Sequence, residues 1–230
     1  MKTLNNYINE ALIKKDTKIS TYNYFPKDKE ELRSLIEQLL EERGKDADLN
    51  DIDTADITDM SDLFYKLDPH NIDISKWDVS NVEDMKGMFF GCENLTCDIS
   101  KWNVSKVKDM KGMFYVCENF NSDLSHWNVS NVKDMYGIFN KCKKFNSDLS
   151  EWDVSNVRNM YSMFYECENF NCDLSKWHIS KVNDMRYMFQ DCKKFTGQGL
   201  ENWNVSGVNR GWGIFSGCDS LKNKPAWYKG

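Results

Sequence analysis

The side chains of this sequence that could carry chemistry are its cysteines, its acids and its few histidines. The 230 residues include 8 Cys but only 3 His, too few for a His-based catalytic triad or metal site. No two cysteines lie two to four residues apart, as zinc ligands usually do. The segment 46–57 starts like a calcium loop, but Asp51 stands where such a loop needs Gly and Ile57 where it needs Glu. We therefore expect no enzyme, no metal and no cofactor; an enzyme confined to the first 44 residues is the remaining alternative.

These residues recur at a fixed spacing. A tryptophan returns every 25 residues and once after 26, and one cysteine and one phenylalanine position share this period. The three series are Trp77, Trp102, Trp127, Trp152, Trp177 and Trp203; Cys92, Cys117, Cys142, Cys167, Cys192 and Cys218; and Phe89, Phe114, Phe139, Phe164, Phe189 and Phe215. Such a period is the signature of a repeat array.

Each unit predicts a short strand followed by a short helix. The alternation through 120–125 is typical of a strand with one buried face. Val132, Met135, Phe139 and Cys142 recur at helical spacing, with Ser130 in front as an N-cap. One unit cannot bury both faces alone, so the units must stack at about 4.8 Å. The predicted fold class is an α/β solenoid of about seven right-handed coils.

The predicted organisation has three parts. Residues 1–44 form a helical arm or cap, with a weaker helix near Leu4–Leu12 and a strong amphipathic helix between Asp28 and Gly44. Residues 45–220 form the repeats, with coils near 45–69, 70–94, 95–119, 120–144, 145–169, 170–194 and 195–220. Residues 221–230 form a C-terminal cap, because Pro225 lacks a backbone donor for further pairing.

The repeat phase also assigns roles to the reactive side chains. Six of the eight cysteines share one position, which predicts a buried ladder of reduced thiols. A second series stacks carboxylates about 4.8 Å apart, so each needs a partner. This acidic series is Asp48, Asp73, Asp98, Asp123, Asp148 and Asp173. We expect its partners to be N–H groups of the following turn, with bound cations as the alternative. The formal charge of −6 lies in residues 45–69, a hypothetical docking face for a basic partner.

Positions that vary between coils identify the candidate partner-binding surface, because the scaffold does not need them. Tyr, Trp and Arg, which dominate interface energies, occur there. The candidate residues are Phe90, Tyr115, Tyr136, Tyr161, Tyr165, Arg186, Tyr187 and Trp212. The alternative is that these rings only pack over neighbouring coils.

The motif N-x-D-L-S-x-W-[DN]-V-S-N-V-x-[DN]-M-x-x-M-F-x-x-C, seen in residues 121–192, resembles the BspA-type repeat of mycoplasma surface lipoproteins and gut bacteria. The resemblance covers about residues 45–228 and implies a leucine-rich-repeat-like array with an adhesive or protein-binding role. It implies no catalytic residues. A structural subunit of a surface or virion assembly is the alternative.

The expected partner is a protein. The net charge of −6 and the absence of a long apolar run disfavour nucleic acid and membrane insertion, while self-association stays open. The first residues show no export signal, which favours a cytoplasmic or virion-associated location over secretion.

Overall fold

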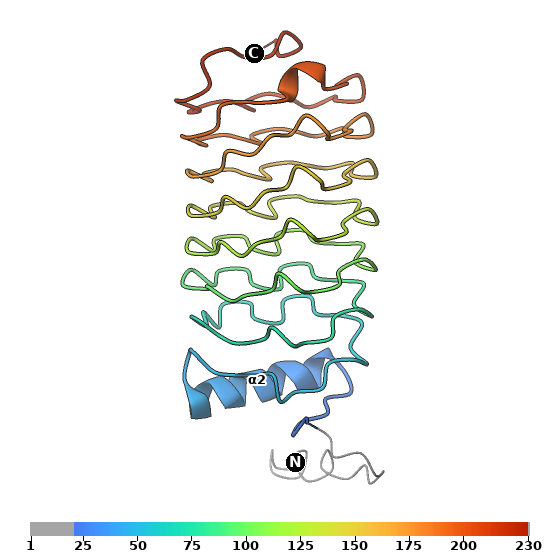
Figure 1. Ribbon diagram of the computed structural model, residues 1–230, viewed down its shortest axis with the longest axis vertical. Helices are drawn as coiled ribbons and strands as arrows, with labels where there is room; N and C mark the ends of the chain where they lie inside the picture. The colour runs from blue at the N-terminus through green and yellow to red at the C-terminus, as the bar shows by residue number, and fades with distance from the viewer. Residues whose placement is uncertain (1–20, 230) are drawn as a thin grey trace.

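The molecule is a stack of similar coils, and the computed structural model describes residues 21–229 (Figure 1). Helix α2, Lys29–Arg43, lies across one end of the stack, and a single 3-10 turn, η1, spans Leu200–Asn202. Neighbouring coils are joined by isolated parallel bridges such as Asp109↔Asp134, and residues 21–229 contain no continuous sheet. No helix in this described range is long and apolar enough to cross a bilayer.

The repeats contain neither the strand nor the helix that the sequence predicts. The Cys142 N–H bonds three residues back to the Phe139 carbonyl at 2.9 Å, closing a turn. The Phe139 N–H instead bonds to the Met163 carbonyl of the next coil at 3.1 Å. Gly137 and Lys141 have left-handed φ angles of 55° and 63°, and two left-handed residues so close together prevent a helix from continuing.

The predicted fold class, an α/β solenoid of right-handed, leucine-rich-repeat-like coils with an N-terminal helical cap, is therefore wrong. Turns closed every three residues put Met135, Phe139 and Cys142 on the inner side of the coil, at nearly the spacing of a helical stripe. The spacing of three to four residues between buried side chains is present in the coil, but a series of turns produces it and not a helix. The division into arm, repeats and terminal segment stays a prediction, and the weaker helix near Leu4–Leu12 lies outside the described residues.

Helix α2 forms where the amphipathic pattern predicts it. The Asp28 carboxylate accepts a hydrogen bond from the Glu31 N–H at 2.9 Å, and the Gly44 N–H bonds to the Leu40 carbonyl at the other end. Its apolar face, Leu32, Ile36, Leu39 and Leu40, is buried.

The acidic first coil is the docking surface for the basic residues of α2. Lys29 lies 2.9 Å from Asp59, and the Arg43 guanidinium forms a forked pair with Asp51 at 2.9 Å. The Arg43 hydrogen bond lowers the pKa of Asp51. Arg33 donates to the backbone carbonyls of Leu63 at 2.8 Å and of Tyr65 at 3.3 Å. Two of the acidic residues in 45–69, Asp51 and Asp59, are thus paired with basic residues of α2.

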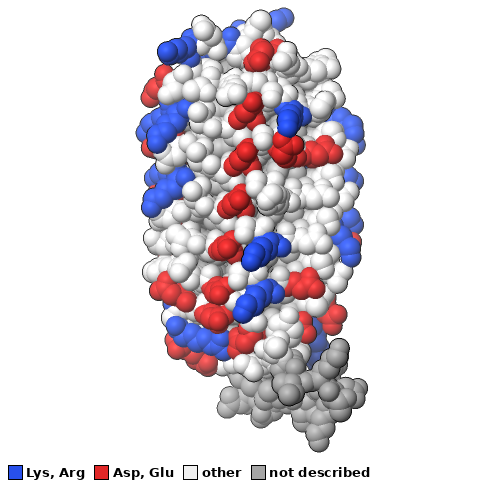
Figure 2. Space-filling view, in the orientation of Figure 1, with Lys and Arg blue, Asp and Glu red and all other residues white. Residues whose placement is uncertain are grey.

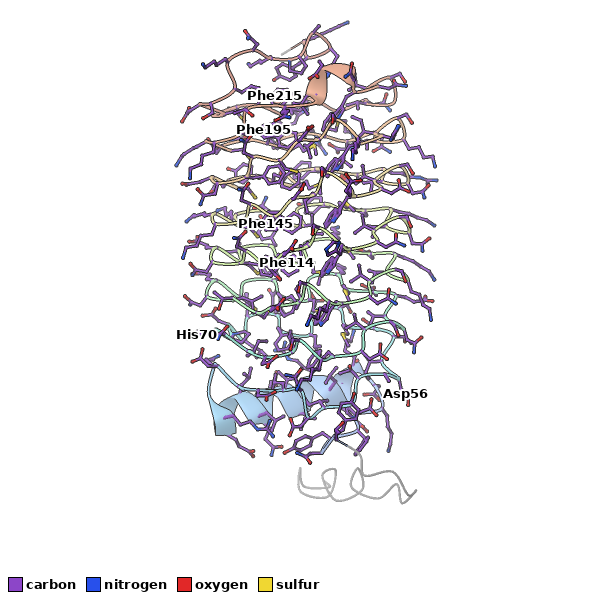
Figure 3. All side chains as sticks on the ribbon, in the orientation of Figure 1. Asp56, His70, Phe114, Phe145, Phe195 and Phe215 are labelled. Atoms are coloured by element: carbon purple, nitrogen blue, oxygen red, sulfur yellow. The ribbon has the colours of Figure 1, made fainter. Side chains whose placement is uncertain are left out.

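The core consists of columns in which the same residue of each coil stacks on its equivalent (Figure 3). The Phe114 and Phe139 rings are parallel within 2° with centroids 5.7 Å apart, and Trp77 and Trp102 are parallel within 2° at 6.4 Å. Each tryptophan of the 25-residue series also donates its indole N–H to a carbonyl of the preceding coil, as Trp152 does to Leu124 at 2.9 Å. These bonds fix the register of the stack.

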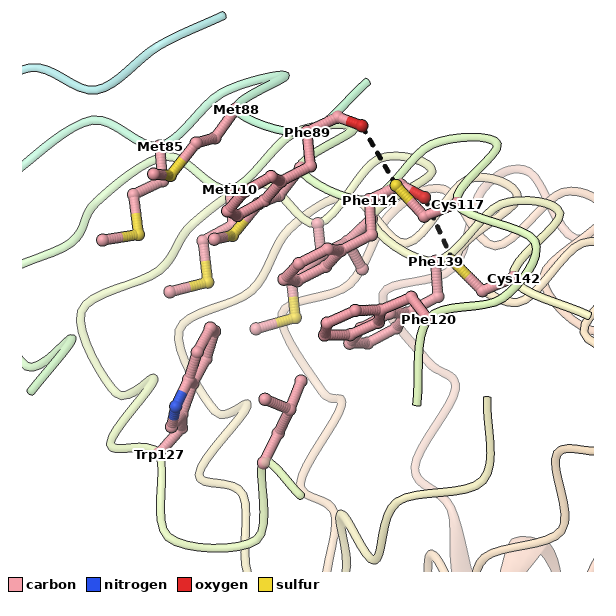
Figure 4. Packing of buried hydrophobic residues seen from close by; sticks show 14 of the residues in the cluster. Met85, Met88, Phe89, Met110, Phe114, Cys117, Phe120, Trp127, Phe139 and Cys142 are labelled. Atoms are coloured by element: carbon pink, nitrogen blue, oxygen red, sulfur yellow. Dashed lines mark hydrogen bonds between the residues drawn. The ribbon is translucent and has the colours of Figure 1, made fainter. Parts of the chain in front are cut away.

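The cysteine ladder is buried, as predicted. The Cys117 thiol donates to the Phe89 carbonyl and the Cys142 thiol to the Phe114 carbonyl, both at 3.0 Å (Figure 4). Seven of the eight cysteines are buried, all eight are free thiols, and Cys218 is half-buried. Burial raises the pKa of each of these thiols, for example that of Cys92 to about 12.

The carboxylates of the acidic series have the partners that the sequence predicts. In all six coils of the series the aspartate accepts the backbone N–H two residues later, as Asp123 does from Ser125 at 2.9 Å. This hydrogen bond lowers the pKa of Asp123 and closes an Asx turn. Figure 2 shows an unbroken column of acidic side chains along the stack, the arrangement expected of this series.

The proposed N-cap role of Ser130 is wrong, because no helix follows it. Its N–H and its hydroxyl both donate to the Asn128 Oδ1, at 3.1 Å and 2.7 Å, in another Asx turn. The acceptor, not the serine, is therefore the structural group at this corner of the coil.

We expect Asn128→Ala to lower the free energy of unfolding by about 1 kcal/mol, because two donors lose their acceptor. Ser130→Ala keeps the backbone bond and should cost less than half as much. Urea titration of both variants checks this order, and a larger loss for Ser130→Ala would contradict the assignment.

Candidate protein-binding face

The candidate residues lie at three neighbouring repeat positions on the turns that follow one corner of each coil. This corner is formed by the residues that bridge neighbouring coils, Asp84, Asp109, Asp134, Asn159 and Asp184. We call them together the aromatic face. Its residues are Tyr65, Phe90, Tyr115, Asn140, Tyr165 and Gln190 at one position; Lys86, Lys111, Tyr136, Tyr161, Arg186 and Trp212 at the second; and Tyr187 at the third. The corner is held by further Asx turns, such as the Tyr136 N–H donating to Asp134 at 2.8 Å.

The rings of the aromatic face stack along the coils. Phe90 and Tyr115 are parallel within 2° with centroids 4.8 Å apart, and Tyr136 and Tyr161 are parallel within 3° at 5.0 Å. Tyr65, which the sequence analysis did not select, continues the first row against Phe90 at 5.3 Å. The rings therefore do pack on their neighbours, as the alternative interpretation held, and they present a preformed row.

Cations extend the stacks at both ends of the second row. The Lys111 ammonium lies 4.8 Å from the Tyr136 ring centroid. The Arg186 guanidinium lies 4.8 Å from the Tyr161 centroid and 5.6 Å from that of Trp212. Asp184 holds this guanidinium with contacts of 2.6 to 3.1 Å, and Asp184 is itself only 6% exposed. The arginine is thus fixed between two rings.

Tyr187 occupies an unusual backbone position. Its φ of 58° is left-handed; the equivalent places in other coils are also left-handed and hold smaller residues, namely Asp62, Gly87, Gly112, Gly137, Ser162 and Gly213. A bulky side chain in this conformation carries strain, and such strain persists where the surroundings hold it. The Tyr187 ring packs edge-on against Trp212 at 4.5 Å.

The members of the face differ in exposure. Tyr65 is 37% and Trp212 50% exposed, whereas Tyr115, Tyr136 and Tyr161 are half-buried. Asn140 is 4% exposed and its Oδ1 has no hydrogen-bond partner among the described residues. Burial raises the pKa of Tyr115 and Tyr136, so their hydroxyls stay neutral donors near neutral pH.

This arrangement has the composition of a binding surface. The face combines rigid rings, fixed cations and neutral hydroxyls, the composition of interface hot spots. A separate groove of about 410 Å³ beside α2 is lined by Glu37, Leu40, Glu41, Lys45 and Leu67. Among residues 21–229 no three His, Cys, Asp or Glu side chains are grouped to hold a metal ion.

In-register coils of one repeated sequence make this chain a repeat protein. A family model described as "Mycoplasma protein of unknown function, DUF285" matches residues 33–141 and 120–227, and the chain belongs to this family. No curated protein and no solved structure matches the chain.

Proposed function

We propose that this chain is a non-enzymatic module that binds another protein through the aromatic face. The observation that carries the proposal is the contrast between constant and variable positions. The inner columns repeat the same residue in coil after coil, while the aromatic face changes from Lys111 to Tyr136 and from Arg186 to Trp212. The scaffold accepts polar residues there, so folding alone does not require the rings.

The composition and geometry of the face support this role. Stacked rings and an arginine clamped by Asp184 have little side-chain freedom left to lose when a partner binds. The BspA-type character of the repeat supports adhesion as the biological use of that binding. The expected partner is a protein.

The test is a triple variant, Tyr136→Ala, Tyr161→Ala and Tyr165→Ala, compared with the wild type in capture of partners from the native environment. We expect capture to be lost while the free energy of unfolding falls by less than about 2 kcal/mol, the stacking energy of partly exposed rings. The matched control replaces the exposed Lys76, Lys101 and His126 by Ala and should keep the captured partner.

Two outcomes would contradict the proposal. The first is a folded triple variant that still captures the partner. The second is a wild-type chain that runs as a large homogeneous assembly at all concentrations, which would favour a structural subunit.

A further inference from the structure

The coil of residues 195–220 leaves a row of backbone donors unpaired. At the preceding interface the N–H groups of Met185, Tyr187, Phe189 and Asp191 bond to carbonyls of the next coil at 2.7 to 3.3 Å. The equivalent N–H groups of this coil belong to Gly211, Gly213, Phe215 and Gly217. None of these four has an acceptor among residues 21–229. Every second residue thus offers a donor along one edge.

This edge lacks the features that usually block pairing. Exposed edges of sheets are commonly protected by Lys or Pro, and residues 211–218 contain neither. Gly211 replaces the buried methionine found in the six preceding coils, so the core column of this position ends before the edge. Trp227 and Tyr228 cover the Phe215 ring at 5.9 and 5.1 Å, but neighbouring Trp212 stays 50% exposed.

The charge at the edge indicates what kind of segment it fits. Along the bridged corner, Asp109, Asp134, Asn159 and Asp184 follow one another, and the next place holds Arg210. The Arg210 guanidinium lies 3.6 Å from Asp184, and its side chain is 65% exposed. A carboxylate in the following place of this column would lie beside Arg210.

We propose that the edge of residues 209–217 binds an extended polypeptide segment of another protein by parallel pairing. The segment carries an aspartate or glutamate at the column position beside Arg210 and small or polar residues four and five positions later, because Ile214 and Phe215 are already covered, at 1% and 3% exposed. Its carbonyls accept from the four free N–H groups, which is strand addition at an open edge. The same pairing occurs inside the chain, because at each interior interface carbonyls of the next coil accept from equivalent N–H groups. This site shares only Trp212 with the aromatic face and uses none of its tyrosines.

The experiment uses the full chain and a fluorescent peptide with the sequence of residues 131–142, carrying Ile138→Ser, Phe139→Ser and Cys142→Ser. Asp134 of the peptide supplies the carboxylate for Arg210. We expect saturable binding by anisotropy, weakened at least about tenfold by Arg210→Glu in the protein. A peptide with Asp134→Lys should bind the wild type poorly and recover on the Arg210→Glu protein. Arg158→Glu, on an interior coil, is the matched control and should leave binding unchanged.

Three results would overturn the proposal. These are no binding of the peptide, equal binding by the Arg210→Glu protein, and no recovery in the charge-swapped pair. A dimer of the wild-type chain that Arg210→Glu disperses would also overturn it, because a second copy would then occupy the edge. Binding that survives in the triple tyrosine variant separates this edge from the aromatic face.

Discussion

Raising the pH from about 8 to about 10.5 under reducing conditions is expected to unfold the protein cooperatively. Burial raises the pKa of the seven buried thiols, to about 12 for Cys92 and Cys172, whereas an unfolded thiol has a pKa of about 8.5. The unfolded chain therefore loses protons first. Stability is complete below about pH 8.5 and falls above it, by about 1.4 kcal/mol per thiol for each pH unit.

The loss of stability with pH is large because seven buried thiols contribute to it. Seven thiols together give about 10 kcal/mol per pH unit, comparable with the whole stability of a typical domain. Urea titrations between about pH 7.5 and 10 measure the slope. Cys172→Ala should lower this slope by about 1.4 kcal/mol per pH unit, the contribution of one thiol. Lys101→Ala, at an exposed site, removes no thiol and should leave the thiol contribution to the slope unchanged. A stability that is constant up to about pH 10.5 would show that the thiols are not buried.

Phe139→Ala is expected to lower the free energy of unfolding by about 3 to 5 kcal/mol. The Phe139 ring is fully buried and stacks on Phe114 at 5.7 Å and on Phe145 at 4.0 Å, so its loss leaves a cavity between two coils. Chemical denaturation followed by tryptophan fluorescence measures the change.

Phe90→Ala is the matched control, because Phe90 is the same residue type on the half-buried aromatic face. We expect it to cost less than half as much. Equal losses at the two sites would mean that the aromatic face is part of the core.

The repeat period reveals which residues lie side by side, but not which backbone carries them. Trp77, Cys117 and Phe139 could be assigned to inner columns because a fixed period of 25 brings equivalent residues together. The helix was wrongly predicted because turns closed every three residues imitate a helical stripe. The left-handed φ of 63° at Lys141 could not be foreseen, since lysine has no preference for that region.

The candidate face was only partly accessible to sequence reasoning. Variation between coils selected Tyr136 and Trp212, and the same repeat phase as Phe90 could have added Tyr65. The clamp of Arg186 by Asp184 could not be seen, because Asp184 shares its phase with the aspartates of other coils. Which rings stack and which stay exposed depends on side-chain rotamers that the spacing does not determine.

The most direct test of the account is a pair of cysteine substitutions on the aromatic face. Equivalent residues of adjacent coils should have Cα atoms about 4.8 Å apart, within the range for a disulfide, whereas a displacement of two coils doubles the separation. Tyr136→Cys with Tyr161→Cys should therefore oxidise to an intramolecular disulfide, measured as a loss of two hydrogens by mass spectrometry. Tyr136→Cys with Arg186→Cys should stay reduced. Failure of the first pair, or equal cross-linking of the second, would contradict a stack of coils in this register.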